Sequence, residues 1–188
     1  MVIHDDESDD SLMEKAAAGN TAAFDRIVRR HQHRLQRFAT RMLGGDSARG
    51  ADVAVGAFLR LWESRGTFRS CGQLGAWLLK SAYRQCLDLL GERIHEPLDA
   101  DFGTPGESLD ARVEKTALAQ AVRDAVMELP QSHRAVLVLS VYEGMSYDAI
   151  AAALEIPAGT VASRKNHAIS ILRGRLAAWN DDLLELRP

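Results

Sequence analysis

Cysteine is scarce in this sequence, with two residues, Cys71 and Cys86, among 188. Neither belongs to a CxxC pair or to a Cys/His cluster with ligand spacing, which argues against a structural zinc site. Two cysteines in a chain of this length are typical of a reducing compartment, because disulfide frameworks use more of them. We therefore predict two free thiols and a cytoplasmic protein.

Long apolar runs are also missing. No run approaches the roughly 20 residues that a transmembrane helix needs, so we expect no insertion into a membrane. The opening residues 1–7 lack the basic and apolar segments of a signal peptide, which predicts that none is present. Runs of β-branched residues are rare, whereas Ala, Leu and Arg are abundant, and this composition favours helix over sheet.

Signatures of catalysis are absent as well. The six histidines are dispersed, and we find no phosphate-binding glycine loop, nucleophile elbow or metal-spaced cluster. His31 and His33 would point about 200° apart on a helix, so they do not form a metal clamp. We expect neither enzymatic activity nor a cofactor.

Charge is distributed unevenly along the chain, although the net charge is only −3. Residues 1–10 carry five acids and no Lys or Arg, and residues 94–113 carry five acids and one Arg. Residues 11–93 carry 14 Lys and Arg against seven acids. Because local charge decides whether a surface attracts phosphates, a small net negative charge does not exclude nucleic-acid binding.

An amphipathic helix is predicted over residues 22–43. Its apolar residues recur on one side at helical spacing: Phe24, Ile27, Val28, Leu35, Phe38 and Met42. Its opposite side carries a row of arginines: Arg26, Arg30, Arg34, Arg37 and Arg41. Two interpretations of this row remain open, a solvated charged face or a surface that meets phosphate or an acidic partner.

Helical periodicity also predicts helices over about 48–64, 73–90, 113–129, 131–143, 146–154 and 160–178. Glycine, proline and acids interrupt this periodicity between residues 91 and 113. The predicted fold class is therefore all-α, with two small helical domains joined by a flexible acidic linker. The predicted boundaries are an acidic leader over 1–10, a first domain over 11–93, a linker over 94–113, a second domain over 114–179 and a tail over 180–188.

The strongest local pattern lies near the C-terminal end and is typical of a DNA-binding helix-turn-helix. Gly144 ends one helix and Ser146 caps the next, Pro157 prevents its continuation, and Thr160 is placed to cap the second helix. Glu155 occupies the turn position that glycine usually fills, so we expect its backbone to avoid positive φ. The alternative is an ordinary helical hairpin with a polar outer face.

Two sets of motifs carry a family resemblance that covers about residues 11–178. The first comprises Ala23-Phe24, Arg29-Arg30, Asp52, Phe58-Leu59-Arg60-Leu61-Trp62, Phe68-Arg69, Trp77-Leu78 and Leu87-Asp88-Leu89-Leu90. The second comprises Leu129-Pro130, Arg134, Gly144-Met145-Ser146-Tyr147, Ile150-Ala151, Ile156-Pro157, Gly159-Thr160-Val161 and Ser163-Arg164. These sets resemble the sigma-2 and sigma-4 domains of the extracytoplasmic-function (ECF) sigma factors of the sigma-70 family.

The resemblance implies a promoter-specificity subunit of bacterial RNA polymerase for a stress or envelope-response regulon. Sigma-2 would bind the β′ clamp of the polymerase core and open the minus-ten element. Sigma-4 would read the minus-35 element as a duplex and contact the β flap. The implied partners are core polymerase, promoter DNA and an anti-sigma factor, which is often membrane-bound in this family.

The resemblance and the helical pattern together assign candidate residues to three surfaces. The minus-35 set is Thr160, Ser163, Arg164, Lys165 and His167. The minus-ten set is Phe68, Arg69, Trp77, Lys80, Tyr83 and Arg84. The core-polymerase set is Asp52, Val55, Gly56, Leu59 and Arg60. We expect Arg164 to read a base, because its guanidinium can bridge two acceptors on guanine, and Lys165 and His167 to touch phosphates.

Three features depart from the family pattern, one of them a thin basic cluster over residues 91–96. Val55-Gly56 stands where the clamp-binding helix usually has Gln-Glu, and Tyr83-Arg84 stands where the promoter-melting helix usually has Arg-Asn. Tyr83 either stacks on an unpaired base or packs in the interior. The alternatives to a promoter-specificity subunit are a stand-alone helix-turn-helix regulator and a sigma-like interaction protein that no longer binds core polymerase.

Overall fold

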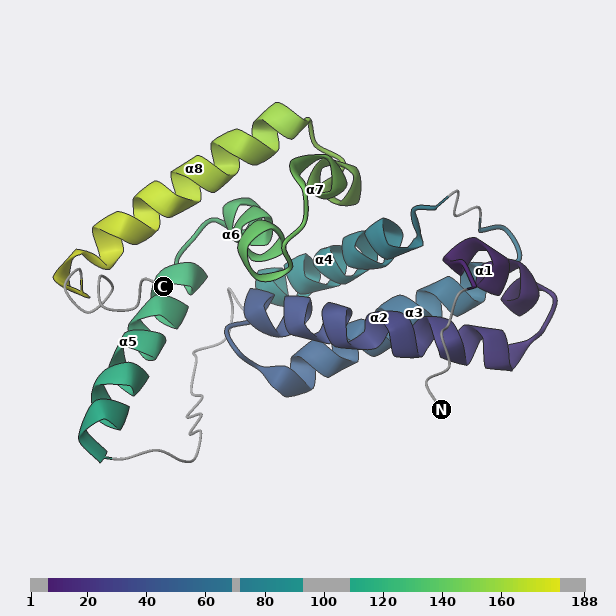
Figure 1. The fold of residues 1–188 in the computed structure, drawn as a ribbon, viewed down its shortest axis with the longest axis horizontal. Helices are drawn as coiled ribbons and strands as arrows, with labels where there is room; N and C mark the ends of the chain where they lie inside the picture. Colours follow the sequence, from purple (N-terminus) through teal and green to yellow (C-terminus); the bar gives the residue numbers. More distant parts are fainter. Residues whose placement is uncertain (1–6, 69–71, 93–108, 180–188) are drawn as a thin grey trace.

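The structure is a computed structural model that describes residues 7–68, 72–92 and 109–179. Every regular element in these ranges is helical, as the sequence predicts (Figure 1). The elements are α1 (Asp9–Ala17), α2 (Thr21–Met42), α3 (Ser47–Ser64), α4 (Leu74–Glu92), α5 (Leu109–Met127), α6 (Gln131–Leu137), a π-helical turn η2 (Val138–Tyr142), α7 (Tyr147–Leu154), α8 (Ala158–Arg175) and a 3-10 turn η3 (Ala177–Trp179). No helix within these ranges is both long and apolar enough to cross a membrane.

Helices α2 and α3 form the centre of the N-terminal half, with α1 packed on α2 and α4 packed on both (Figure 1). The predicted apolar side of α2 faces the core: Ile27, Leu35, Phe38 and Met42 are all at most 1% exposed. Gly44 and Gly45 reverse the chain between α2 and α3 with φ of 78° and 97°, which glycine adopts without strain.

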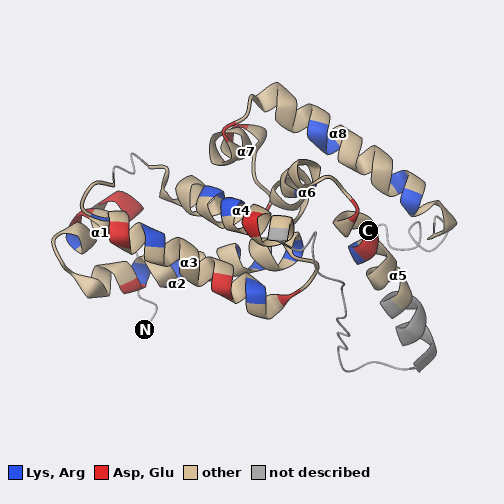
Figure 2. Cartoon of the chain, turned by 180° about the vertical axis from the view of Figure 1, so that it is seen from behind, with Lys and Arg blue, Asp and Glu red and all other residues tan. Residues whose placement is uncertain are grey.

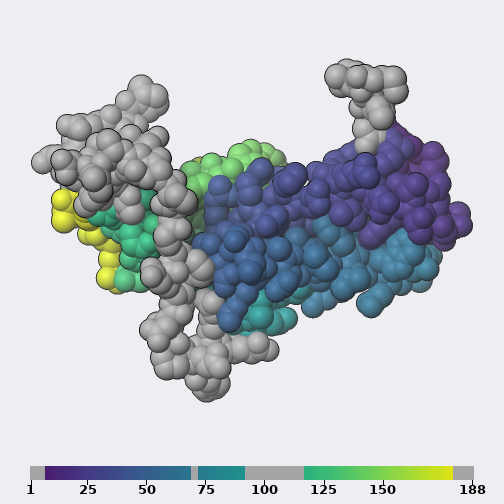
Figure 3. Space-filling view, turned by 90° about the horizontal axis from the view of Figure 1, so that it is seen from below, coloured from purple at the N-terminus to yellow at the C-terminus, as the bar shows by residue number. Residues whose placement is uncertain are grey.

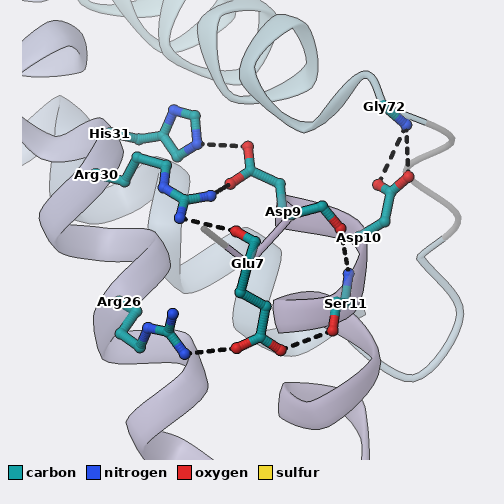
Figure 4. Close-up of polar contacts among 9 residues, drawn as sticks. Glu7, Asp9, Asp10, Ser11, Arg26, Arg30, His31 and Gly72 are labelled. Atoms are coloured by element: carbon teal, nitrogen blue, oxygen red, sulfur yellow. Dashed lines mark hydrogen bonds and ion pairs between the residues drawn. The ribbon is translucent and has the colours of Figure 1, made fainter. Parts of the chain in front are cut away.

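The acidic leader ends earlier than predicted, because α1 already begins at Asp9. Figure 4 shows acids of this segment bound to the arginine row of α2: Glu7 accepts from Arg26 (2.6 Å), and Asp9 accepts from Arg30 (2.5 Å). The second Asp9 oxygen lies 2.8 Å from His31 Nε2. The start of the arginine row therefore meets acids of this same chain.

The C-terminal half is built from α5 to α8 around a small apolar cluster of Val126, Leu129, Leu137 and Ala168. Helix α5 begins at Leu109, inside the segment predicted as a linker. The rest of that linker lies outside the described residues, as does the predicted tail. The single predicted helix over 131–143 is continuous in space, but its last turn, η2, widens to π-helical geometry.

One buried apolar cluster extends through both halves. It contains Leu35 and Phe38 of α2 together with Val136, Val138 and Leu139 of the α6–η2 segment. In Figure 3 the green surface of the C-terminal half lies directly against the blue surface of the N-terminal half. The two halves that the sequence distinguishes are therefore packed together in this structure.

Candidate nucleic-acid interface

Helices α7 and α8 form the predicted helix-turn-helix. The Ser146 hydroxyl accepts a hydrogen bond from the Ala149 N–H (3.2 Å), which confirms it as the cap of α7. The predicted cap of α8 was wrong, because that helix begins at Ala158 with Pro157 at its cap. Thr160 lies in the first turn instead, and its N–H donates to the Pro157 carbonyl (2.9 Å). Proline suits a helix start, where its missing N–H would have no partner.

The turn itself differs from expectation at Glu155. Its backbone is left-handed (φ 54°, ψ 47°), and it is the one non-glycine residue with positive φ among those described. The reason is geometric: α7 ends in a left-handed cap that reverses the chain toward α8. Behind the turn, Ile150 and Val161 are completely buried, so the two helices are fixed to each other by apolar packing.

The five predicted minus-35 residues lie on the first three turns of α8. Ser163 and His167 are exposed, whereas Thr160, Arg164 and Lys165 are half-buried. The His167 ring meets the His133 ring of α6 edge-on (5.0 Å), and Lys165 lies 5.3 Å from the centre of the Tyr147 ring. Burial lowers the pKa of His133, and the nearby His167 and Arg164 lower it further. Four basic groups therefore lie on or beside α8, namely His133 of α6 and Arg164, Lys165 and His167 of α8 itself.

The predicted minus-ten residues line α4 and the loop before it. Phe68 packs edge-on against Trp77 (5.3 Å between ring centres), and Arg69 lies outside the described residues. Beside this aromatic pair is a hollow of about 120 Å³. Its walls are Phe68, Gln73, Ala76, Trp77, Lys80, Ala152 and Glu155, so α7 supplies one side of it.

A second hollow, of about 270 Å³, lies on the other side of Lys80. It is lined by Arg60, Trp77, Lys80, Ser81, Arg84 and Asp88. Figure 2 shows the basic residues along α4 and α8. Tyr83 is half-buried and packs against the shared apolar cluster, and burial raises its pKa, opposed by the charge of Arg164. Of the two interpretations of Tyr83, this structure shows the packed one.

The predicted core-polymerase residues lie on α3. Val55 and Leu59, one helical turn apart, are each 57% exposed and form an apolar strip, with Asp52 and Arg60 also exposed. Gly56 lies where the Gln85 side chain of α4 approaches α3, and a Cβ there would overlap the Gln85 amide. A larger residue at position 56 therefore requires the flexible end of the Gln85 side chain to move.

Sequence reasoning missed the contacts that join the two halves. Glu155 forms ion pairs with Lys80 and, at 3.8 Å, with Arg84. Glu143 accepts hydrogen bonds from Arg37 (3.3 Å) and Arg41 (3.3 Å) of the α2 arginine row, and it forms an ion pair with Arg34 at 3.8 Å. No sequence pattern identifies these pairs, because the acids and their partners lie 71 to 109 residues apart in the chain.

Comparison with known proteins places both halves in one family. The family model described as "Sigma-70 region 2" matches residues 27–93, and the model described as "Sigma-70, region 4" matches residues 119–172. The ECF RNA polymerase sigma factor SigM of Mycobacterium tuberculosis (strain H37Rv) is 34% identical over 173 residues, covering 92% of this chain and 84% of that protein.

Two solved structures are similar throughout. The structure of CnrH in complex with the cytosolic domain of CnrY has a TM-score of 0.69 and 27% identity, covering 92% of this chain and 99% of that one. The sigma factor RpoE of Bartonella quintana, in complex with the anti-sigma factor NepR, has a TM-score of 0.65. At 20% identity, with 82% of this chain and 96% of that one covered, it supports the fold.

This chain therefore belongs to the ECF sigma factors of the sigma-70 family. Members of the family are transcription initiation factors that give RNA polymerase promoter specificity under anti-sigma control, and they are not enzymes.

Proposed function

We propose that this chain uses three surfaces in transcription initiation. Helix α8 binds the minus-35 duplex, α4 binds the minus-ten element, and α3 binds core polymerase. The observation that carries the proposal is the helix-turn-helix. Its second helix, α8, carries Ser163, Arg164 and His167 on its first three turns, and α7 packs against the opposite side of α8. Arg164 reads a base and Lys165 contacts phosphate.

Helix α4 supplies the minus-ten surface. The aromatic pair of Phe68 and Trp77 borders a hollow beside Lys80, an arrangement suited to unpaired bases, which stack on aromatic rings near positive charge. Arg84 lies one turn further along the same helix and contacts the phosphate backbone. Tyr83 joins this surface when the C-terminal half moves away from α4.

Helix α3 supplies the clamp contact. An exposed apolar pair flanked by charges is typical of a protein interface, and Val55, Leu59, Asp52 and Arg60 provide one. The β flap of the polymerase is the partner of the C-terminal half. Because core polymerase and promoter DNA are in the bacterial cytoplasm, the protein acts there.

An anti-sigma factor is the fourth partner. It is supported by the likeness to CnrH, whose structure was determined with the cytosolic domain of CnrY. A partner described by its cytosolic domain fits a membrane-bound anti-sigma factor.

The test is transcription from a promoter library by core polymerase, with and without this protein. Sigma function requires new transcripts that share minus-35 and minus-ten sequences. Binding to core polymerase and to duplex DNA is measured alongside transcription. If the protein binds duplexes selectively but does not bind core polymerase, it is a stand-alone regulator. If it neither binds core nor initiates transcription, it is a sigma-like interaction protein.

A further inference from the structure

We infer that Asp10 of α1 is a positioning residue for the minus-ten surface, because its carboxylate holds the backbone that leads into α4. By sequence, Asp10 belongs to the predicted acidic leader and to none of the three predicted interaction surfaces. The inference rests on the proposed function, since α4 and Phe68 before it form the surface proposed to bind the minus-ten element.

The contact joins two segments that are 62 residues apart in the chain. Both carboxylate oxygens of Asp10 accept from the Gly72 N–H, at 2.9 Å and 3.1 Å (Figure 4). Gly72 has a φ of 77°, which glycine adopts without strain but which it also leaves easily. A hydrogen bond to an ionised carboxylate is stronger than one between neutral groups. Asp10 therefore selects one conformation at a position that has many.

Helix α1 is itself fixed in place, which Asp10 needs if it is to hold Gly72. Its apolar side is in the core, where Leu12 and Ala16 are completely buried. The neighbouring acid, Asp9, accepts from Arg30 of α2 (2.5 Å), and its other oxygen lies 2.8 Å from His31 Nε2. Two consecutive aspartates thus face two different elements, one bound to α2 and the other to the segment before α4.

His31 brings α2 to the same place. Its side chain is 13% exposed, and its Cε1 atom lies 3.5 Å from where a Cβ on Gly75 would be. Leu74, the first residue of α4, is 1% exposed. The first turn of α4 is therefore bounded by α1 at Gly72 and by α2 at Gly75, so it has little freedom to shift while the Asp10 contact is intact.

The aromatic pair proposed for unpaired bases follows directly from this turn. The Gln73 carbonyl accepts from the Trp77 N–H (2.9 Å), and both residues line the hollow of about 120 Å³. Trp77 in turn meets Phe68 edge-on. A change at Gly72 therefore moves a wall of the hollow and the ring on which a base would stack. Binding sites depend on such supporting hydrogen bonds, because small displacements of the contacting groups weaken them.

A purely structural role for Asp10 makes a different prediction. An acid in the first turn of a helix stabilises it through its charge, whatever else it contacts. Asparagine has no charge but keeps an oxygen that accepts from the Gly72 N–H. If Asp10 acts by positioning, Asp10→Asn should retain most of the function and Asp10→Ala should lose it. If only the charge matters, the two variants should be equally impaired.

The first experiment observes Trp77 in the full chain by fluorine resonance after labelling with 5-fluorotryptophan. The chain has three tryptophans, Trp62, Trp77 and Trp179, and Trp77→Phe identifies the relevant signal. Asp10→Ala should shift or broaden the Trp77 signal and leave that of Trp179, in the C-terminal half, unchanged. Asp10→Asn should resemble the unmodified protein. Glu14→Ala, which removes the same charge from an exposed position one turn along α1, is the matched control and should change none of the signals.

Hydrogen exchange tests the contact without any substitution. In the unmodified protein, the Gly72 amide proton should exchange about tenfold more slowly than in an unstructured peptide of the same sequence, because a net hydrogen bond of this kind is worth about a factor of ten. Exchange at the peptide rate would overturn the inference. So would an unchanged Trp77 signal in Asp10→Ala, or equal changes in Asp10→Asn and Asp10→Ala.

The second experiment measures minus-ten opening by core polymerase reconstituted with each variant, on a promoter selected from the library. Asp10→Ala should slow strand opening about fivefold and flatten base preference in the minus-ten element. Its affinity for core polymerase and its minus-35 base preference should stay unchanged, which a general loss of structure would not allow. Asp10→Asn should stay within about twofold of the unmodified protein, and Glu14→Ala should match it.

Two outcomes separate this inference from the proposed function. If the unmodified protein initiates promoter-specific transcription and Asp10→Ala opens the minus-ten element equally fast, only the positioning role of Asp10 is refuted. If the unmodified protein does not initiate transcription although Asp10→Ala changes the Trp77 signal, the proposed function is refuted and the link from Asp10 to α4 stands.

Discussion

The buried guanidinium of Arg134 donates hydrogen bonds to backbone carbonyls of both halves of the molecule. It is 4% exposed, and it donates to the carbonyls of Met42 (2.8 Å), Val126 (3.1 Å) and Leu129 (3.2 Å), with a further bond to Met127. Met42 is the last residue of α2, where helix carbonyls lack partners within the helix. One side chain from α6 thereby completes the end of a helix in the other half.

Arg134→Met should therefore destabilise the protein strongly. It keeps much of the side-chain volume but leaves buried carbonyls without a donor, and one hydrogen bond to a charged group is worth about 1.5–3 kcal/mol. We expect the free energy of unfolding in urea to fall by about 3 kcal/mol. The matched change Arg173→Met, at an exposed position of α8, should stay within about 0.5 kcal/mol. Similar losses in both variants would contradict this role for Arg134.

Burial raises the pKa of the Cys86 thiol to about 12, although the nearby charge of Arg134 acts in the opposite direction. The folded state therefore keeps the thiol proton between pH 9 and 12, where the unfolded chain loses it. Because the folded state binds more protons there, stability should fall as pH rises above 9, by at most about 1.4 kcal/mol per pH unit.

The measurement compares urea unfolding of Cys71→Ser with that of Cys71→Ser/Cys86→Ala at pH 8 and pH 10. The difference between the two proteins isolates Cys86 from other groups that titrate in this range. A thiol reagent at pH 8 should label Cys86 only upon unfolding. Rapid labelling of the folded protein would show that the thiol is accessible.

Arg164 and Lys165 should differ in how they affect duplex recognition. Arg164→Ala should cost about 1–3 kcal/mol at the preferred minus-35 sequence and remove the base preference at one position. Lys165→Ala should weaken all sequences nearly equally and reduce the salt dependence of binding. Polymerase holoenzyme reconstituted with each variant is measured on single-base minus-35 variants at two salt concentrations. Full sequence preference in Arg164→Ala would place base reading elsewhere on α8.

At the level of helices, the α2–α3 pair depends on a close approach at Gly50. A Cβ there would overlap the Thr40 hydroxyl and lie 2.9 Å from the Thr40 backbone nitrogen. Alanine gains about 1 kcal/mol in helix propensity, but overpacking against backbone costs about 1–3 kcal/mol, so the clash should prevail. We expect Gly50→Ala to lower the free energy of unfolding by about 1–2 kcal/mol. Gly66→Ala, where the added carbon meets nothing within 4 Å, is the control and should be nearly neutral.

Helices and their apolar sides could be predicted because they follow from local spacing. The period of Ile27, Leu35 and Phe38 identifies the buried side of α2 without knowledge of what covers it. The start of α5 was placed four residues too late, at Val113 instead of Leu109, because acids near the linker were taken as its continuation. The stretch Leu109–Met127 contains no Gly or Pro, and this absence is a better guide to where α5 begins.

Contacts between the halves could not be predicted in the same way. The arginine row of α2 indicated an acidic partner as one of two interpretations, but nothing local to Glu143 distinguishes it from a solvated acid. At Glu155 the expectation of negative φ was wrong, because the left-handed cap of α7 determines the backbone there. Such pairings depend on tertiary packing, which one sequence does not encode in its periodicity. The proposed DNA and polymerase contacts of the predicted site residues stay predictions.

At the scale of the whole molecule, the ion pairs between the two halves should make their packing against each other sensitive to salt. The electrostatic screening length shortens from about 10 Å at 0.1 M salt to about 3 Å at 1 M. An exposed ion pair contributes at most about 1 kcal/mol to stability. Raising KCl over this range should therefore increase the fraction of molecules with separated halves up to about fivefold. Spin labels at Glu63→Cys on α3 and Ser170→Cys on α8, both exposed positions, in a Cys71→Ser background, would show this as a broader distance distribution. Glu155→Lys should respond less, because its main pair is already lost. A larger salt response in Glu155→Lys would contradict this account.

The left-handed backbone at Glu155 also has a consequence for protein engineering. Replacement by glycine should relieve about 1 kcal/mol of local strain at the end of α7 and strengthen the helix-turn-helix. The same replacement removes the carboxylate that holds Lys80 and Arg84. Selection for heat tolerance of the helix-turn-helix would therefore enrich Glu155→Gly and, with it, loss of the ion pairs between the end of α7 and α4.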